Sequence, residues 1–335
     1  MLVGHFSKAG MGLFWLAPKF IKMFWKPGLD RKRVKPSTID GYDSVLDRHL
    51  LPQLGDLRIA DVAPLHVEEI VQKKTREGFS AKTIRNMVMV LRGIFTLAVE
   101  QDVIPRSPVR KSHMPESEKK EKRIWTPDEV RKIIDAAPAA YKALFALVAL
   151  TGIRLGELLA LQWKHVDSEA GSLRITQSIW RGQIVAPKTT GSVRMIWMGP
   201  VLTDILKAHE QASQHRDRED FIFCKPDGSP LHPDVLRKDV LYPILDRLGI
   251  QRFPRESGFH AFRHSAGSIV NNETGNLKLA QVLLGHSNLS TTADVYTHTL
   301  TEAERGASEA LEKAIFGTLF PVVPKTGTGN RFSVN

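Results

Sequence analysis

Apolar residues recur at helical spacing through most of this chain. Three segments of its first half, residues 35–55, 65–78 and 79–102, place large apolar side chains three and four positions apart. Ser37 or Thr38 is a candidate N-cap for the first helix, and Ser80 for the third. The pattern predicts an all-helical domain over residues 35–112.

The composition then changes. The stretch PRSPVRKSHMPESEKKEKR has three prolines, many charges and few large apolar side chains, so residues 113–123 are expected to form an exposed linker. Its Lys119, Lys120 and Lys122 are either simply solvated or placed along a phosphate backbone.

A second domain is expected over residues 124–317, followed by a loose tail at 318–335. Thr126, Pro127 and Glu129 form the pattern of a capping box at its first helix. A long apolar helix ends at Gly152, and RLGELLALQW begins another. The runs LRITQSIW, QIVAPK and VRMIWM, separated by turns, predict a three-stranded antiparallel meander before the chain returns to helix. The fold class is therefore mainly α with a small antiparallel β-sheet (α+β).

Charge narrows the class of partner. The net charge is +11 and the pI about 9.7, which favours a polyanion, either nucleic acid or an anionic membrane face. Residues 1–35 hold eight Lys and Arg against one acid, Asp30. The apolar run at 10–25 is interrupted by lysines and is too short to span a bilayer. It is either an amphipathic basic helix on a membrane surface or one that packs on a partner. No targeting signal is recognised, so a cytoplasmic protein is expected, with no membrane among its assigned partners. Residues 1–34 are assigned to a separate basic and apolar segment.

Several residues are suited to phosphate chemistry. Arg154 follows Gly152 at a helix start, Lys188 lies in a turn between strands, and FHAFRHS carries His260, Arg263 and His264. His260 and Arg263, three positions apart, are expected to share a helix face. The His260–His264 spacing also suits a metal, but an arginine within the site and the absence of a HExxH glutamate argue against zinc. A single cysteine excludes a multi-cysteine metal site.

The segment LGHSNLSTTADVYTH adds His286 and Tyr296. In this order, TGIRLGELLALQW, the β-turn lysine, HAFRH and LLGHSNLSTTADVYTH resemble the tyrosine recombinases of the phage-integrase type, over roughly residues 35–312. The resemblance implies a helical core-DNA-binding domain at 35–112 and a catalytic domain at 124–317. The catalytic residues that it implies are Arg154, Lys188, His260, Arg263, His286 and Tyr296.

These residue types fit metal-independent cleavage of a phosphodiester. Arg154 and Arg263 can bind non-bridging oxygens bidentately. Tyr296 supplies the nucleophile and needs a base, for which His260 is the candidate; Lys188 is the candidate acid for the leaving oxygen. His286 would contact the phosphate or orient Tyr296. Glu157 is not assigned a catalytic role, because a carboxylate beside phosphate is unfavourable and the first helical turn favours an acid.

The resemblance also implies partners. These are double-stranded DNA, three further copies of the chain in a homotetramer on DNA, and accessory DNA-bending proteins, with no cofactor and no metal. Arg85 and Arg92, on the polar side of the third helix, are candidate DNA contacts. The N-terminal segment is either a remnant of an arm-site domain or a mis-assigned start. A type IB topoisomerase and a DNA-binding protein without catalysis are the alternative functions.

Overall fold

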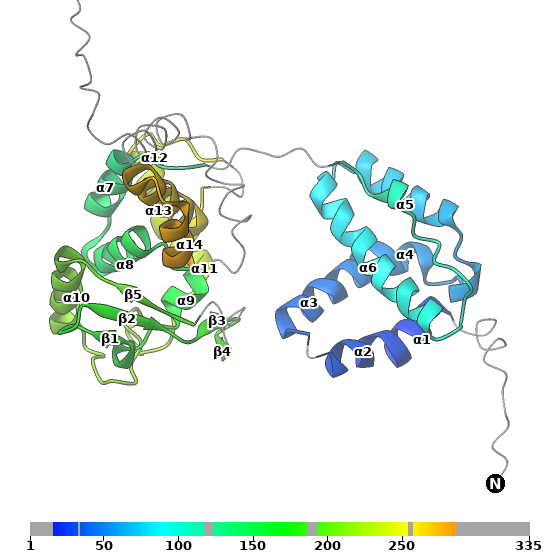
Figure 1. The fold of residues 1–335 in the computed structure, drawn as a ribbon, viewed down its shortest axis with the longest axis horizontal. Helices are drawn as coiled ribbons and strands as arrows, with labels where there is room; N and C mark the ends of the chain where they lie inside the picture. The colour runs from blue at the N-terminus through cyan, green and yellow to red at the C-terminus, as the bar shows by residue number, and fades with distance from the viewer. Residues whose placement is uncertain (1–15, 33, 117–122, 186–192, 254–256, 286–335) are drawn as a thin grey trace, which may run out of the picture. The chain divides into compact units, whose positions relative to one another are not determined.

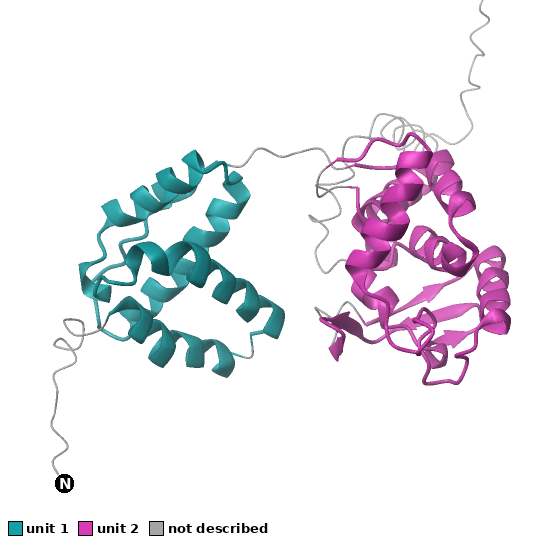
Figure 2. Ribbon diagram, turned by 180° about the vertical axis from the view of Figure 1, so that it is seen from behind, with its two compact units in different colours: residues 1–120 teal, residues 121–335 magenta. Residues whose placement is uncertain are grey.

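The chain folds into two compact units, each with its own hydrophobic core. The computed structural model describes residues 16–32, 34–116, 123–185, 193–253 and 257–285. Unit 1 comprises residues 1–120 and unit 2 residues 121–335 (Figures 1 and 2). The predicted fold class, mainly helical with small antiparallel sheets, is confirmed. In the described ranges no helix combines the length and apolar character that crossing a bilayer requires.

Unit 1 is helical throughout its described part. Its helices are α1 (Ala17–Phe20), α2 (Lys26–Arg31), α3 (Pro36–Val45), α4 (Leu51–Leu54), α5 (Pro64–Arg76) and α6 (Ala81–Glu100), with π-helical turns at Ile21–Trp25 and Leu46–Leu50 and 3-10 turns at Ile59–Asp61 and Lys111–His113. The Ser80 hydroxyl caps α6 by accepting from the Thr83 amide at 3.2 Å, as predicted. The cap predicted at Ser37 or Thr38 is wrong: Lys35 is the N-cap and Pro36 takes the first helical position, where its missing N–H costs nothing.

The core of unit 1 begins earlier than residue 35. Phe20, Ile21 and Trp25 are 0%, 6% and 5% exposed, and the Trp25 ring lies 5.4 Å from that of Tyr42. The assignment of residues 1–34 to a separate segment is therefore wrong for residues 16–32. The lysines that interrupt this apolar run, Lys19 and Lys22, point to solvent while the aromatic side chains pack inward.

The linker is also shorter than predicted. His113 is buried in unit 1, and its Nδ1 accepts from the Arg110 amide at 3.1 Å. At the other end, Arg123 donates to Glu129 at 2.7 Å and lies over the Phe253 ring, which ties it to unit 2. Residues 117–122, which include Lys119, Lys120 and Lys122, are outside the described residues.

Unit 2 is built around a central apolar helix. Its elements are α7 (Pro127–Ala136), α8 (Ala139–Thr151), α9 (Leu155–Leu159), a 3-10 turn (Trp163–His165), β1 (Val166–Asp167), β2 (Ser172–Ile175), β3 (Ser178–Trp180), β4 (Gln183–Val185), β5 (Arg194–Trp197), α10 (Pro200–Ala212), α11 (Pro233–Val235), a π-helical turn (Leu236–Leu241), α12 (Tyr242–Arg247), α13 (Phe259–Thr274) and α14 (Leu277–Leu284). Helix α8 packs against α7, α10 and α13 (Figure 1). The predicted capping box is present: Thr126 and Glu129 exchange contacts of 2.9 and 3.2 Å.

The sheet differs from the predicted meander. Strand β2 pairs with β5, opposing Leu173 to Ile196, while β1 lies on the other side of β2. Strands β3 and β4 form a separate hairpin that turns at Arg181 and Gly182, both with positive φ. The run LRITQSIW splits because Gln177 turns away and donates to the Ala160 carbonyl at 2.7 Å.

Three helices meet closely at Gly152, which ends α8 with φ at +59°. A Cβ at this position would lie 2.6 Å from Leu284 Cδ2 and 3.3 Å from Ala266 Cβ. Glycine is therefore required twice here, for the left-handed backbone and for the approach of α13 and α14.

Gly275→Ala provides a matched control, because Gly275 ends α13 at φ +61° and a Cβ there would have no neighbouring atom within 4 Å. We expect Gly275→Ala to lower the unfolding free energy by about 1 kcal/mol, from backbone strain alone. Gly152→Ala should cost roughly 1–3 kcal/mol more, from overpacking. Urea unfolding of the two variants measures the difference, and equal losses would contradict the close packing described.

Candidate active site

Arg154 is held at the start of α9. It occupies the N-cap position, and its main-chain amide donates to Glu157 Oε2 at 3.2 Å. Its guanidinium Nη1 donates to Glu157 Oε1 at 2.8 Å. The left-handed turn at Gly152 and this double contact fix both the backbone and the side chain of Arg154, at the position that the sequence predicts.

Arg263 is carried by α13 and faces the helix junction. Phe259 and Phe262, on an adjacent side of α13, pack on the Phe145 ring in the core at 5.7 and 5.8 Å. This packing leaves Arg263 only 4% exposed, with Nη1 donating to the Gly152 carbonyl at 2.7 Å and Nη2 to the Leu284 carbonyl. A buried guanidinium requires such acceptors.

The two arginines converge on the end of α14. Arg263 donates to the Leu284 carbonyl, and Arg154 Nη2 lies 3.5 Å from the carbonyl oxygen of the next residue, Gly285. The C-terminal end of a helix carries partial negative charge, which favours nearby cations. Residues from α9 and α13, over a hundred positions apart in sequence, are thus brought together directly before His286.

The sequence does not point to Arg194, which completes this cluster from β5. Its Nη1 and Nη2 lie 3.2 and 3.1 Å from Glu157 Oε2, and its Nε donates to the Leu283 carbonyl at 3.3 Å. A signal was present: in VRMIWM, alternation places Arg194 on the same face as buried Ile196 and Met198. A basic residue on a core-facing position requires acceptors within the protein, and for Arg194 these are the Glu157 carboxylate and the Leu283 carbonyl.

Burial and charge act in opposite directions on Glu157. Burial raises the pKa of its carboxyl, but Arg194 and Arg154 outweigh this effect and hold the pKa below its ordinary value. Burial also lowers the pKa of the Arg194 guanidinium, against the opposing effect of Glu157. The interpretation of Glu157 as a first-turn acid is confirmed, and the structure adds that it bridges two arginines.

His260 lies one turn before Arg263 on α13 and is exposed, whereas Arg263 points inward. The two are neighbours on α13 at the spacing that predicted a common face, and they differ in burial. The His260 and His264 rings have centroids 6.4 Å apart in an edge-on arrangement. Lys188, His286 and Tyr296 lie outside the described residues.

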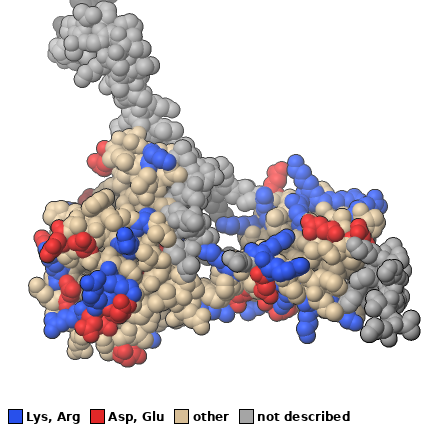
Figure 3. Space-filling view, turned by 60° about the horizontal axis from the view of Figure 1, so that its bottom comes forward, with Lys and Arg blue, Asp and Glu red and all other residues tan. Residues whose placement is uncertain are grey.

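Unit 1 has a shallow hollow lined by basic side chains. Arg85 and Arg92 of α6 border it together with exposed Met89, and the following segment contributes Lys111 and one acid, Glu116. Basic side chains outnumber acidic ones on the visible face of unit 1, with acidic side chains among them, and both kinds are interspersed on unit 2 (Figure 3). Residues 1–120 hold 21 Lys and Arg against 13 Asp and Glu.

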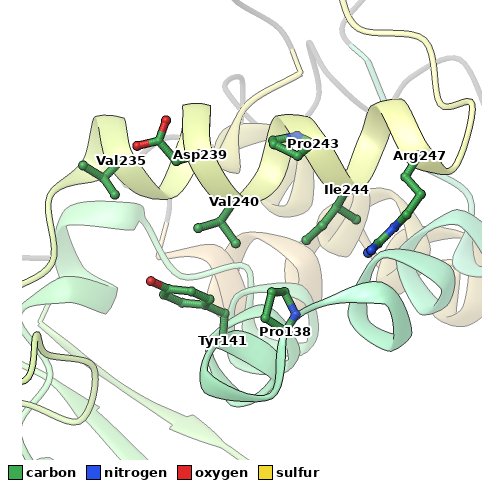
Figure 4. Close-up of a pocket in the computed structure, with 8 residues that line it drawn as sticks. All are labelled: Pro138, Tyr141, Val235, Asp239, Val240, Pro243, Ile244 and Arg247. Carbon is green, nitrogen blue, oxygen red and sulfur yellow. The ribbon is translucent and has the colours of Figure 1, made fainter.

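Unit 2 has a hollow of its own, which is separate from the cluster formed by Arg154, Arg194 and Arg263. It lies between the start of α8 and the segment from α11 to α12, and Tyr141, Val240 and Ile244 supply much of its apolar lining (Figure 4). Of the predicted catalytic residues that the structure describes, none lines it.

Comparison with known proteins identifies the family. The model of the phage integrase family matches residues 123–303, more than half of the 335-residue chain. The chain belongs to the phage integrase family. It is a tyrosine recombinase, an enzyme of DNA strand breakage and rejoining, and its partner is DNA. The model of the N-terminal SAM-like domain of phage integrases matches residues 19–75, which agrees with the core that begins before residue 35.

Relatives cover most of this recombinase. The tyrosine recombinase XerC-like protein of Caldanaerobacter subterraneus subsp. tengcongensis is 29% identical over 323 residues, covering 86% of this chain and 80% of the relative. The ICEBs1 integrase of Bacillus subtilis is 24% identical, covering 83% and 78%. The Tn1549 transposon integrase, solved with a circular intermediate DNA, has the same fold: TM-score 0.75, 22% identity, covering 87% of this chain and 99% of that one.

The contacts of Glu157 with Arg154 and Arg194 predict that the free energy of unfolding depends on pH. At neutral pH, Glu157→Gln should lower the unfolding free energy by about 3 kcal/mol, because it leaves the buried guanidinium of Arg194 and the half-buried guanidinium of Arg154 without their carboxylate. The folded pKa of Glu157 is lowered, so the wild-type advantage is complete above the ordinary value of 4.5 and is lost as pH falls through the folded pKa. Urea unfolding of both proteins between neutral and acid pH measures this. A difference in unfolding free energy between the two proteins that stays constant over this pH range would contradict the prediction.

Proposed function

We propose that Tyr296 of this recombinase attacks a DNA phosphodiester bound by Arg154 and Arg263. The bond to the 5′ oxygen breaks, a free 5′ hydroxyl leaves, and the DNA remains attached to the protein through a 3′-phosphotyrosine. The observation that supports this most directly is the convergence of the two guanidinium groups on consecutive carbonyls at the end of α14. In the sequence, Tyr296 lies eleven positions after Gly285, which ends that helix.

Each remaining residue has one step in this scheme. His260 accepts the proton of the Tyr296 hydroxyl, whose ordinary pKa is near 10. Lys188 donates a proton to the leaving 5′ oxygen, and His286 contacts the phosphate or orients Tyr296. The exposed position of His260, one turn from Arg263, is compatible with access to DNA. The phosphotyrosyl bond preserves the energy of the phosphodiester, so the 5′ hydroxyl of another strand can attack it and reseal the DNA.

The assembly that we propose is a homotetramer on DNA, exchanging strands in two rounds through a Holliday junction. Accessory DNA-bending proteins belong to the same proposal. Residues 301–317 support it at the level of sequence, since TEAERGASEALEKAIFG is amphipathic as a helix and can dock on a neighbouring copy. Similarity to the ICEBs1 and Tn1549 integrases supports a role in the integration of a mobile element.

The basic hollow of unit 1 is the proposed DNA-binding surface of that unit. Arg85 and Arg92 are seven positions apart on α6, so they lie on one side of the helix, two turns apart. A guanidinium pair at this spacing can contact successive phosphates along one DNA backbone. Lys119, Lys120 and Lys122 are proposed as further contacts with the DNA backbone.

The nucleophile is tested with a suicide DNA substrate, which traps the covalent intermediate. We expect the wild-type protein to form an adduct that survives denaturing electrophoresis, and Tyr296→Phe to form none, because the phenol oxygen is the attacking atom. Tyr141→Phe is the matched control and should retain the adduct. An adduct in Tyr296→Phe, or none in the wild type with a cognate site, would overturn the proposal. Recombinant product from two sites excludes simple topoisomerase activity.

The DNA-binding surface is tested by salt dependence. Each phosphate contact contributes about −0.9 to the slope of log K against log salt concentration, so Arg85→Ala and Arg92→Ala should each make the slope shallower by about one. Arg76→Ala, an exposed arginine of α5 that does not line the hollow, is the control and should leave the slope unchanged. Fluorescence anisotropy at several salt concentrations gives the slopes. Unchanged slopes for Arg85→Ala and Arg92→Ala would place the DNA elsewhere.

A further inference from the structure

Arg194 is a buried cation at a distance in sequence from every described residue assigned to catalysis. Its side chain is 8% exposed, and it reaches from β5 to two acceptors. One is Glu157 Oε2, at 3.1 and 3.2 Å, and the other is the Leu283 carbonyl, at 3.3 Å. Burying a guanidinium is costly, so its placement beside a phosphate-binding arginine calls for a physical reason.

The reason lies in the charge of Glu157. This carboxylate is 3% exposed and bonds Arg154 Nη1 at 2.8 Å, so it fixes the guanidinium that is proposed to bind phosphate. Alone, it would also cancel the charge of Arg154 and repel the phosphate. Arg194 adds a second cation to the same carboxylate, so the three side chains together carry one net positive charge. The interaction is strong because all three are removed from water to a large extent.

Arg194 also acts on the main chain. The carbonyls of Leu283, Leu284 and Gly285 accept from Arg194, Arg263 and Arg154 respectively. Three arginines from β5, α13 and α9 therefore hold three consecutive carbonyls at the end of α14. Arg194 links the orientation of Arg154, through Glu157, to the position of this helix end.

We propose that Arg194 is a positioning residue for DNA cleavage: it neutralises Glu157 so that Glu157 can orient Arg154 without cancelling its charge at the scissile phosphate. The inference rests on the proposed role of Arg154 as a phosphate ligand. Arg194 itself does not contact DNA in this account. Its effect should therefore appear in the rate of cleavage more than in DNA affinity.

The test compares Arg194→Met, Glu157→Gln and the double variant. Single-turnover cleavage of a suicide substrate at saturating DNA gives the rate, anisotropy gives DNA affinity, and thermal unfolding reports the fold. Arg194→Met should cleave about 10²-fold more slowly, comparable to the loss of one charge-stabilising donor, with DNA affinity changed far less. The double variant, which also removes the uncompensated carboxylate, should regain about tenfold or more over Arg194→Met. Arg194→Lys, which keeps the charge but not the paired contacts, should fall between.

Arg174→Met is the matched control, since Arg174 lies on the neighbouring strand β2 opposite Met195 and is exposed. It should cleave like the wild type. A wild-type rate in Arg194→Met, or a folded double variant no faster than Arg194→Met, would overturn the inference and indicate a merely structural role. If Arg194→Met does not fold, Arg194→Lys decides the question: slower cleavage than the wild type at nearly unchanged DNA affinity supports the inference, and a wild-type rate overturns it. Absence of any adduct in the wild type would instead overturn the proposed function.

Discussion

The structure of the catalytic unit depends on hydrogen-bond acceptors for its buried guanidinium groups. Arg263 is 4% exposed, and its two described contacts are main-chain carbonyls at the ends of α8 and α14. These contacts exist only because Gly152 lets α8 end in a left-handed turn against Leu284 and Ala266. The helix ends supply partial negative charge to the arginines, and the arginines in turn donate to carbonyls that lie beyond the reach of the helical hydrogen-bond pattern. The geometry of the arginine cluster that is proposed to bind phosphate thus follows from the packing of three helices.

Glu157 shows how such a site combines precision with positive charge. A carboxylate gives the strongest available anchor for a guanidinium, but it opposes an anionic substrate. The pairing of Glu157 with both Arg154 and Arg194 resolves this conflict, and both arginines also reach the end of α14. His286 and Tyr296 follow that end in sequence. The cluster proposed to bind the phosphate therefore also holds the helix end that directly precedes the segment with the proposed nucleophile.

Sequence alone predicts the parts of this structure that local chemistry determines. The Ser80 cap, the Thr126–Glu129 capping box and the helix end at Gly152 each depend on neighbouring residues, and all three are confirmed. Other features depend on partners that are distant in the chain. Two such features are the pairing of β2 with β5 and the packing of Trp25 on Tyr42, and both differ from the sequence-based prediction.

The same distinction applies to the site. Arg154 and Arg263 were found because their motifs are short and ordered along the chain. Sequence does not predict the role of Arg194, because its partners on α9 and at the end of α14 are distant in the chain. Only its core-facing position on β5 could be predicted from the alternation of apolar residues. The structure describes the positions of Arg154, His260 and Arg263 and does not describe Lys188, His286 and Tyr296. The catalytic roles of all six rest on the family resemblance and remain predictions.

The central claim, that the arginine cluster at the end of α14 is the phosphate site, is tested most directly by a crystal structure. The Tyr296→Phe protein bound to duplex DNA would show the uncleaved scissile phosphate. We predict guanidinium nitrogens of Arg154 and Arg263 within about 3 Å of its non-bridging oxygens, with the contacts of Glu157 to Arg154 and Arg194 retained. A phosphate bound away from the two arginines, or Glu157 displaced from Arg194, would contradict the account.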